Sequence, residues 1–182
     1  MSITQLRERL PEYARDLKLN LSLVGGAGEL SPRQQWGAAL ASAMATGNAE
    51  VIAAIAADAV PFLDEAAQRA ARAAAAIMGM NNIYYRFVHF MGEGNDYARM
   101  PARLRMQVIG NPGVDPVDFE LWCLAVSAIH GCEACVRAHE KVVRDKGATA
   151  SMVQDAVRIA AVVHAVAGVL TAEEALAAPA AA

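Results

Sequence analysis

Two of the three cysteines in this chain lie in one short segment that also carries a histidine. Cys132 and Cys135 stand at Cys-x-x-Cys spacing, and His139 follows the second cysteine by four residues. In a helix, residues three and four positions apart share a face, so both sulfurs and the imidazole would lie together. Only a thiolate is strongly nucleophilic, and a helix start or a neighbouring acid–base group lowers a thiol pKa from its usual ~8.5. The segment therefore predicts a redox-active dithiol.

A predicted helix break just before the pair assigns different surroundings to the two sulfurs. Gly131 ends one helix, which puts Cys132 in the first turn of the next, where free backbone N–H groups favour a thiolate. Cys135 lies one turn further in and nearer to His139, so we expect it to be the more buried sulfur. In the usual dithiol chemistry one thiolate attacks a peroxide or a disulfide, and the other closes an intramolecular disulfide.

A carboxylate extends the candidate site backward across this break. Glu120 precedes Cys132 by twelve residues and lies in the first turns of the preceding predicted helix. Facing His139, it would hold the imidazole and let the ring exchange protons with a thiol. The same residue is equally well explained as a glutamate that interacts favourably with the helix dipole. The sequence does not decide between these two interpretations.

Two other interpretations of the cysteines remain open. Cys132, Cys135, His139 and Glu120 together would make a zinc-ligand set, although no second Cys-x-x-Cys or histidine pair completes a structural site. Alternatively, the pair consists of two small side chains buried in an alanine-rich core, since free cysteine is often buried. The third cysteine, Cys123, has no partner at a useful spacing, and we expect a packed core thiol there.

Composition predicts that these residues are carried by a single all-α domain spanning residues 1–182. The chain contains 41 alanines, which favour helix and close helix packing, and only 5% aromatic residues. No alternating Val/Ile/Thr pattern indicates strands. The net charge is −3 without a cluster of basic residues, which argues against a nucleic-acid-binding surface. Three cysteines at these positions do not make the disulfide framework of a small secreted protein.

The same composition predicts a soluble cytoplasmic protein without a membrane segment. No uninterrupted apolar run approaches the ~18 residues of a bilayer span. The first twenty residues carry too many charges for the apolar core of a signal peptide.

Punctuating residues predict where the helices begin and end. Ser31-Pro32 and Asn48 are start signals, Gly47 and Gly147 are stop signals, and Ser151 with Gln154 resembles a capping box. The predicted helical segments are 3–24 with an interruption at Pro11, 32–46, 49–59, 61–77, 81–91, 115–129, 132–146 and 151–168. Loops are expected at 92–95 and 110–113, and the alanine-rich end from Ala177 is expected to fray.

An internal repeat relates the cysteine segment to an earlier part of the chain. Residues 76–80 (AIMGM) align with residues 128–132 (AIHGC) at an offset of 52 positions. The alignment predicts a helix-break-helix unit in both copies, a degenerate one at about 61–92 and an active one at about 115–147. Each reactive position of the second copy has an unreactive counterpart in the first: Gln68 for Glu120, Met80 for Cys132, Ile83 for Cys135 and Phe87 for His139.

Nearly the whole chain resembles the alkyl hydroperoxidase D (AhpD) family, within the carboxymuconolactone decarboxylase-like superfamily. The most specific part is the motif already described, with Glu120 before the two cysteines and His139 after them. The other matching segments are residues 10–21 (LPEYARDLKLNL), 76–82 (AIMGMNN), 111–113 (NPG), 119–122 (FELW) and 127–132 (SAIHGC).

The resemblance implies an all-helical homotrimer that acts as a thiol-dependent peroxidase on alkyl hydroperoxides. It implies no bound cofactor, electrons from dihydrolipoamide on a lipoyl-bearing acyltransferase, and a peroxiredoxin partner, AhpC, that the dithiol also reduces. It further implies that Cys135 attacks the peroxide and passes through a sulfenic acid. Cys132 would be the exposed thiol that closes the disulfide and meets the reductant, and Glu120 with His139 would be the proton relay.

Two positions depart from the family pattern. Members of the family carry histidine as the second residue between the cysteines, where this chain has Ala134, and often asparagine at the position of His130. We hypothesise that His130 partly replaces the missing acid–base group, because it lies two residues before Cys132. The alternative functions are a decarboxylase-like enzyme acting on a lactone, which would not require both cysteines, and a zinc-stabilised helical interaction module.

Overall fold

The computed structural model describes residues 1–26 and 28–177, and every regular element in these two ranges is helical. No strand occurs in them, which confirms the prediction of an all-α protein. The α-helices are α1 (Ile3–Arg9), α2 (Arg15–Asn20), α3 (Pro32–Thr46), α4 (Ala49–Ala59), α5 (Glu65–Phe90), α6 (Gln107–Gly110), α7 (Pro116–Ile129), α8 (Glu133–Asp145) and α9 (Ala150–Ala177), and the 3-10 turns are η1 (Glu12–Ala14), η2 (Leu21–Leu23) and η3 (Asp96–Arg99).

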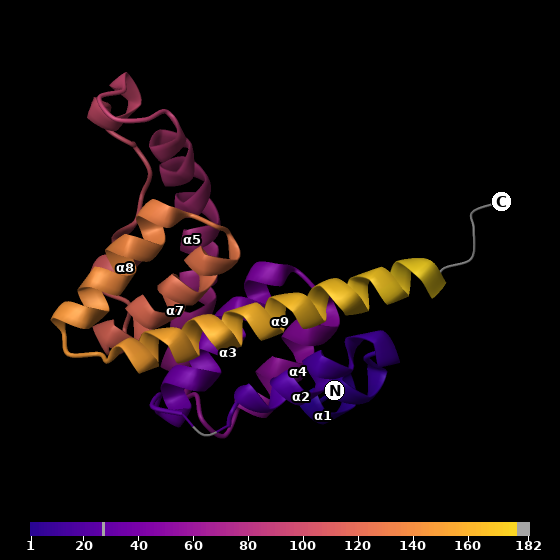
Figure 1. Ribbon diagram of the computed structural model, residues 1–182. Helices are drawn as coiled ribbons and strands as arrows, with labels where there is room; N and C mark the ends of the chain where they lie inside the picture. Colours follow the sequence, from indigo (N-terminus) through magenta and orange to yellow (C-terminus); the bar gives the residue numbers. More distant parts are fainter. Residues whose placement is uncertain (27, 178–182) are drawn as a thin grey trace.

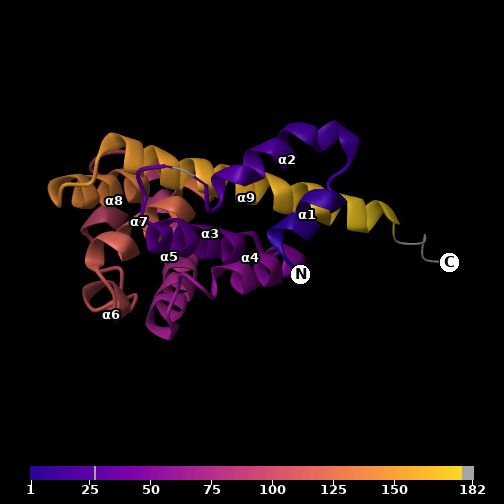
Figure 2. The same ribbon diagram turned by 90° about the horizontal axis from the view of Figure 1, so that it is seen from below.

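Helix α3 lies at the centre of the bundle, in contact with α4, α5, α7 and α9. Figures 1 and 2 show the long α9 running across the bundle, while the far end of α5 projects away from it. Helices α7 and α8 both pack against α5. The segments that carry the cysteines are thereby placed against the middle of a long helix that is distant from them in sequence.

The central position of α3 depends on small residues. All nine residues from Gln35 to Ala43 are buried, so this helix has no solvent-facing side over that stretch. A Cβ atom at Gly37 would come within 2.1 Å of the Trp122 ring, and Trp122 Nε1 donates a hydrogen bond to the carbonyl oxygen of Gln34 at 3.1 Å. Close approach of the Trp122 ring therefore requires glycine at position 37 and fixes α7 against α3.

Several helix ends lie where the sequence signals place them. Pro11 follows the end of α1, and Ser31 forms a capping box at the start of α3. Gly47 adopts a left-handed conformation after α3, with φ of 72°. The side chain of Asn48 accepts a hydrogen bond from the N–H of Val51 at 2.9 Å and caps α4.

The predicted break in the first repeat copy is wrong, because α5 continues through Gly79 as one helix of 26 residues. It begins at Glu65 with Asp64 as its cap rather than at Pro61. Only the second copy has the break, where Gly131 adopts a left-handed conformation with φ of 64°. A mid-helix glycine costs about 1 kcal/mol relative to alanine, which the packing of a long helix outweighs. The helix-break-helix repeat is therefore not present as predicted.

Helix α9 also differs from its predicted bounds. The hydroxyl of Thr149 accepts a hydrogen bond from the N–H of Met152 at 3.1 Å, so Thr149, and not Ser151 with Gln154, satisfies the start of the helix. The helix passes Gly168 and continues to Ala177, because buried residues such as Leu170 hold it to the core beyond that glycine. The predicted frayed end after Ala177 lies outside the described residues.

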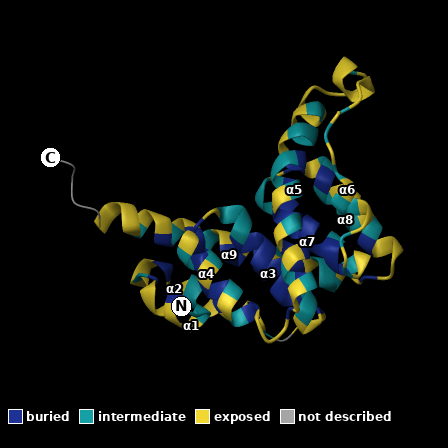
Figure 3. Cartoon of the chain, turned by 180° about the vertical axis from the view of Figure 1, so that it is seen from behind, coloured by how far each residue is buried: buried dark blue, intermediate teal, exposed yellow. Residues whose placement is uncertain are grey.

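Helix α9 is long and apolar enough to span a membrane, although the sequence has no uninterrupted apolar run of that length. By length and hydropathy it would suit a span, with an 18-residue window of mean hydropathy 1.6. Its residues Ile159, Val163 and Leu170 are instead buried against the rest of the bundle (Figure 3). Core helices of globular proteins share this composition, and α9 is built into the core here.

Gly79 and Gly131 stand at equivalent repeat positions in different conformations, so the same substitution should have opposite effects. We expect Gly79→Ala to raise the free energy of unfolding by about 1 kcal/mol, since a Cβ there meets no atom within 4 Å. We expect Gly131→Ala to lower it by about 1–2 kcal/mol, because φ is positive. Urea denaturation of the two variants measures both values. Changes of the same sign would contradict the assignment of a single break.

Candidate active site

The turn between α7 and α8 fixes the position of the first cysteine. The N–H of Gly131 donates to the carbonyl oxygen of Ala128, and the N–H of Cys132 donates to that of Ser127, both at 3.2 Å. This pair of hydrogen bonds around a left-handed glycine is a Schellman motif, which satisfies carbonyl groups at the end of α7. Cys132 is therefore held by the end of one helix while it begins the next.

Both cysteines lie in the first turn of α8, as the sequence predicts. Cys132 is the N-cap residue of α8, and its sulfur accepts a hydrogen bond from the N–H of Cys135 at 3.4 Å. A sulfur at an N-cap faces the partial positive charge of the helix start. When the pair is reduced, this position stabilises a thiolate at Cys132.

The two sulfurs are bonded to each other. A disulfide joins Cys132 and Cys135, whose Cα atoms are 5.3 Å apart. That Cα separation is within the ordinary range for a disulfide, so the first turn of α8 accommodates the oxidised pair with its helical backbone intact. The structure thus represents the oxidised state of the dithiol.

The predicted order of burial is wrong. Cys132 has 0% exposure, and Cys135, at 7%, is the more accessible of the two. Cys132 lies in the turn where the ends of α7 and α8 enclose it, whereas the side chain of Cys135 lines an open cavity. The expectation that Cys132 is the exposed thiol does not fit this state of the protein.

The structure brings Glu120 and His139 into contact and so decides the alternative that the sequence left open. Nδ1 of His139 is 2.6 Å from Oε2 of Glu120, and the two side chains are only 12% and 13% exposed. An ionised carboxylate only accepts hydrogen bonds, so Nδ1 carries the proton. The other ring nitrogen, Nε2, lies 3.2 Å from the sulfur of Met78. The ring is therefore fixed at Nδ1 by Glu120 of α7, and its Nε2 lies beside Met78 of α5.

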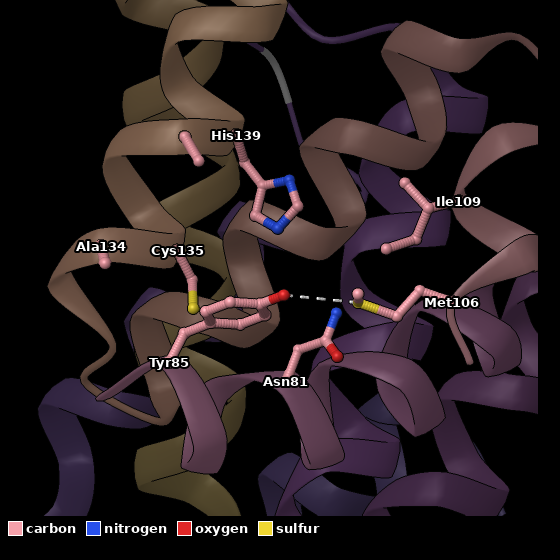
Figure 4. Close-up of a pocket in the computed structure, with 8 residues that line it drawn as sticks. Asn81, Tyr85, Met106, Ile109, Ala134, Cys135 and His139 are labelled. Carbon is pink, nitrogen blue, oxygen red and sulfur yellow. Dashed lines mark hydrogen bonds between the residues drawn. The ribbon is translucent and has the colours of Figure 1, made fainter. Parts of the chain in front are cut away.

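A cavity of about 250 Å³ lies beside the disulfide and the imidazole (Figure 4). It is lined by Asn81 and Tyr85 of α5, Met106 and Ile109 at α6, and Ala134, Cys135, Ala138 and His139 of α8. Two of the four predicted site residues, Cys135 and His139, thus face one cavity. Glu120 contacts the same imidazole, and Cys132 is covered behind its partner sulfur.

The wall opposite α8 was not predicted from the sequence. The hydroxyl of Tyr85 donates to the sulfur of Met106 at 4.0 Å, and Ile109 extends the apolar surface. Asn81 projects from α5 and is the most polar residue of that wall (Figure 4). Asn81 lies in the family-like segment 76–82, but nothing in that segment marks it as a cavity residue. Tyr85, Met106 and Ile109 carry no motif, and the segments joining them to α8 are long.

His130 does not line this cavity, in contrast to the role hypothesised for it. Its Nδ1 lies 3.0 Å from the amide nitrogen of Asn82, whose oxygen accepts a hydrogen bond from Ser127, also at 3.0 Å. The Arg86 guanidinium donates to the carbonyl oxygen of His130. Burial, together with the nearby charge of Arg86, lowers the pKa of His130. The imidazole is thus favoured in its neutral form, as an acceptor that ties α5 to the α7–α8 turn.

The third cysteine behaves as predicted. Cys123 is a free thiol, fully buried in the hydrophobic core. Burial, with a smaller contribution from the carboxylate of Glu120, raises the pKa of this thiol far above its ordinary value. It is therefore a packed, protonated side chain.

In residues 1–26 and 28–177, no group of three or more His, Cys, Asp or Glu side chains is arranged to hold a metal ion. Of the predicted zinc-ligand set, Cys132 and Cys135 are bonded to each other, and His139 is hydrogen bonded to Glu120.

Comparison with known proteins gives matches over nearly the full length. The model of the carboxymuconolactone decarboxylase family matches residues 95–178, which include Glu120, both cysteines of the pair and His139. A protein from Rhodospirillum centenum named alkyl hydroperoxide reductase AhpD is 58% identical over 97% of this chain and 94% of its own length. Proteins of the same name from Gluconacetobacter diazotrophicus and Maricaulis maris are 62% and 56% identical, over 97% and 95% of this chain and 96% and 99% of their own lengths.

The position of His130 predicts how stability depends on pH. Its pKa is lowered in the folded protein, so its contribution to stability is present above the unfolded value of ~6.5 and is lost as pH falls through the folded value. We expect part of the loss of unfolding free energy below about pH 6.5 to disappear in His130→Asn, since an amide does not titrate. Urea denaturation at several pH values measures this. An identical pH dependence in both proteins would contradict the assignment.

Proposed function

The chain belongs to the AhpD family within the carboxymuconolactone decarboxylase superfamily, and we propose that it is an alkyl hydroperoxide reductase working through a Cys132–Cys135 dithiol/disulfide cycle. The observation that carries the proposal is the disulfide at the start of α8, next to a cavity that the Glu120–His139 pair adjoins. The names of its relatives, all alkyl hydroperoxide reductase AhpD, support the activity.

In the proposed cycle Cys135 is the sulfur that meets the peroxide, because it lines the cavity and Cys132 does not. The Cys135 thiolate attacks the terminal oxygen of the hydroperoxide, and the O–O bond breaks. The sulfur is oxidised to a sulfenic acid, and the other oxygen leaves as an alkoxide that takes a proton to become the alcohol. The Cys132 thiolate then attacks the sulfenic sulfur, forming the disulfide and expelling hydroxide, which is released as water after protonation.

His139 is the proposed proton donor and acceptor in this cycle. It lines the same cavity as Cys135, and its Nδ1–H is fixed by Glu120. A ring whose Nδ1–H donates to Glu120 leaves Nε2 to take the thiol proton before attack and to return it to the alkoxide afterwards. Glu120 orients the ring and stabilises the imidazolium that forms in between.

The electron donor we propose is dihydrolipoamide on a lipoyl-bearing acyltransferase, with no cofactor bound by the chain itself. A thiolate of the reductant attacks one sulfur of the disulfide and expels the other. In the described state the accessible sulfur is Cys135, and the expelled sulfur is Cys132, whose N-cap position stabilises a leaving thiolate. We also propose that the reduced dithiol passes electrons to a peroxiredoxin of the AhpC type, in a cytoplasm whose thiols are kept reduced.

We propose that the protein is a homotrimer. Figure 3 shows much of the outer part of α5 as exposed or half-buried. Large apolar side chains are exposed there and in the segment after it, including Ile83 at 65% and Phe90 at 70%. Phe87, Met91 and Met100 are further exposed members of this group. A group of exposed large apolar side chains of this kind is typical of contacts between subunits.

Two alternatives make different predictions. A decarboxylase-like enzyme is favoured by the name of the matching family model, but its reaction would not require both cysteines. A zinc-stabilised interaction module would contain stoichiometric metal and show no turnover. Zinc determination on the purified protein, together with assays of the cysteine variants, distinguishes these alternatives from a dithiol peroxidase.

Substitution of single cysteines tests the proposed cycle. With an alkyl hydroperoxide as substrate and dihydrolipoamide as reductant, we expect Cys135→Ser to abolish turnover, because the attacking sulfur is lost. Cys132→Ser should also abolish it, because no disulfide can form. Cys123→Ser is the matched control and should retain activity, since that thiol is buried and protonated. Equal losses at Cys135 and Cys123, or full activity without Cys135, would refute the cycle.

Charged substitutions on the outer half of α5 test the trimer. We expect the wild-type protein to sediment as a trimer, and the double variant Ile83→Asp/Phe90→Asp to sediment as a smaller species with unchanged helix content. Both side chains are mostly exposed in the isolated chain, so the carboxylates disturb only a contact between subunits. Analytical ultracentrifugation and circular dichroism give the two readouts. A monomeric wild-type protein would rule the proposal out.

A further inference from the structure

One buried side-chain oxygen lining the cavity has no hydrogen-bond partner among residues 1–26 and 28–177. Asn81 is only 4% exposed, lines the cavity, and its side-chain oxygen is buried without a hydrogen bond. Figure 4 shows its amide on the α5 side of the cavity, across from His139 on α8. The hydrogen bond drawn among these cavity residues joins Tyr85 to Met106 and leaves the amide of Asn81 out. A buried amide left unpaired is costly, and such groups call for a functional explanation.

The neighbouring Asn82 is an example of an asparagine with a structural role in the same part of α5. Asn82 is fully buried, and its amide is fixed at both ends, accepting from Ser127 and bonded to His130. Nothing comparable fixes the amide of Asn81. The terminal torsion of asparagine is broad and roughly two-fold, so the Asn81 amide is free to turn its N–H or its C=O toward a molecule in the cavity.

The rest of the cavity indicates what kind of molecule that is. Its volume of about 250 Å³ lies just below the ~300–1,000 Å³ of pockets for drug-sized ligands, so it suits a small compound. Met106, Ile109 and Ala138 give it an apolar wall. Its polar groups, Asn81, the Tyr85 hydroxyl and His139, line the same cavity as Cys135. The cavity thus fits a small molecule with an apolar body and one compact polar group placed at the sulfur.

We propose that Asn81 binds the substrate, its amide N–H donating a hydrogen bond to the hydroperoxide oxygen that leaves as alkoxide. The proposal rests on the proposed peroxidase function and assigns the substrate class as a small organic hydroperoxide, with its alkyl group against Met106 and Ile109. As the Cys135 thiolate attacks the terminal oxygen, the O–O bond breaks and negative charge moves to the inner oxygen. With its N–H turned toward that oxygen, the amide stabilises the charge until His139 supplies the proton.

The amide of Asn81 therefore acts on the oxidative half of the cycle alone. Reduction of the disulfide by dihydrolipoamide breaks an S–S bond, and no alkoxide forms. A residue with a purely structural role would affect both halves, because both depend on the same helix turn. This difference separates the proposal from loss of folding.

The test uses the reduced protein mixed with tert-butyl hydroperoxide, with consumption of Cys135 thiol followed in a single turnover. We expect Asn81→Leu to lower the second-order rate constant for oxidation about 100- to 1,000-fold, which is the loss expected from one hydrogen-bond donor to developing charge. The rate of disulfide reduction by dihydrolipoamide should not change. The melting temperature should stay the same or rise, because an unpaired buried amide is removed. Asn81→Ala is a second variant with the same expected result.

Asn82→Leu is the matched control. It should lower the melting temperature, because it leaves Ser127 and His130 without their partner. Oxidation of Asn81→Leu at the wild-type rate would overturn the proposal, as would equal losses in both half-reactions together with a lower melting temperature. A wild-type protein whose Cys135 does not react with the hydroperoxide would instead overturn the proposed function, a result that needs no variant to recognise.

Discussion

The candidate site depends on one turn of backbone, in which the end of α7 becomes the beginning of α8. Gly131 adopts the left-handed conformation that closes α7, and the next residue, Cys132, both donates to α7 and caps α8. Because Cys132 takes part in both helix ends, no flexible linker separates α7 from α8. The turn therefore sets the direction of α8, and with it the positions of Cys135 one turn later and His139 two turns later. Glu120 can reach His139 because the two helices leave this turn side by side.

The continuous α5 provides the side chains that contact His130 and His139 from the other side of the site. Because the helix does not break at Gly79, Met78 and the residues around Asn82 stay in register against α7 and α8. Asn82 and Arg86, one turn apart, hold the side chain and the carbonyl oxygen of His130. Met78 contacts the free nitrogen of His139. A break in α5 at Gly79 would separate these contacts. Gly79 must therefore stay helical, whereas Gly131, at the equivalent repeat position, must end α7.

The sequence contained the chemistry of the site but only part of its geometry. Helix ends with a side-chain cap, such as those at Ser31 and Asn48, could be predicted because their hydrogen bonds are local. The repeat led to the wrong prediction of a helix break at Gly79, because both copies contain glycine at that position. The two copies differ in the residue after that glycine: the sulfur of Cys132 accepts a backbone hydrogen bond and caps α8, whereas Met80 continues α5 as an ordinary helical residue. The α5 wall of the cavity depends on tertiary contacts, which local patterns do not encode.

Cys132 is more buried than Cys135, the opposite of the prediction, and this difference gives the two sulfurs distinct surroundings that their spacing alone does not determine. Cys132 is enclosed by the turn and placed at the positive end of α8, so as a thiolate it is stabilised and shielded. Cys135 borders the cavity, so in the proposed cycle peroxide and reductant both meet this sulfur. Ala134 contributes to this access, because it lines both this cavity and a neighbouring hollow of about 400 Å³ that also borders His89. A larger side chain at position 134 would project into that space. The small residue that departs from the family pattern thus removes an acid–base group and, by the same change, leaves the approach to Cys135 open.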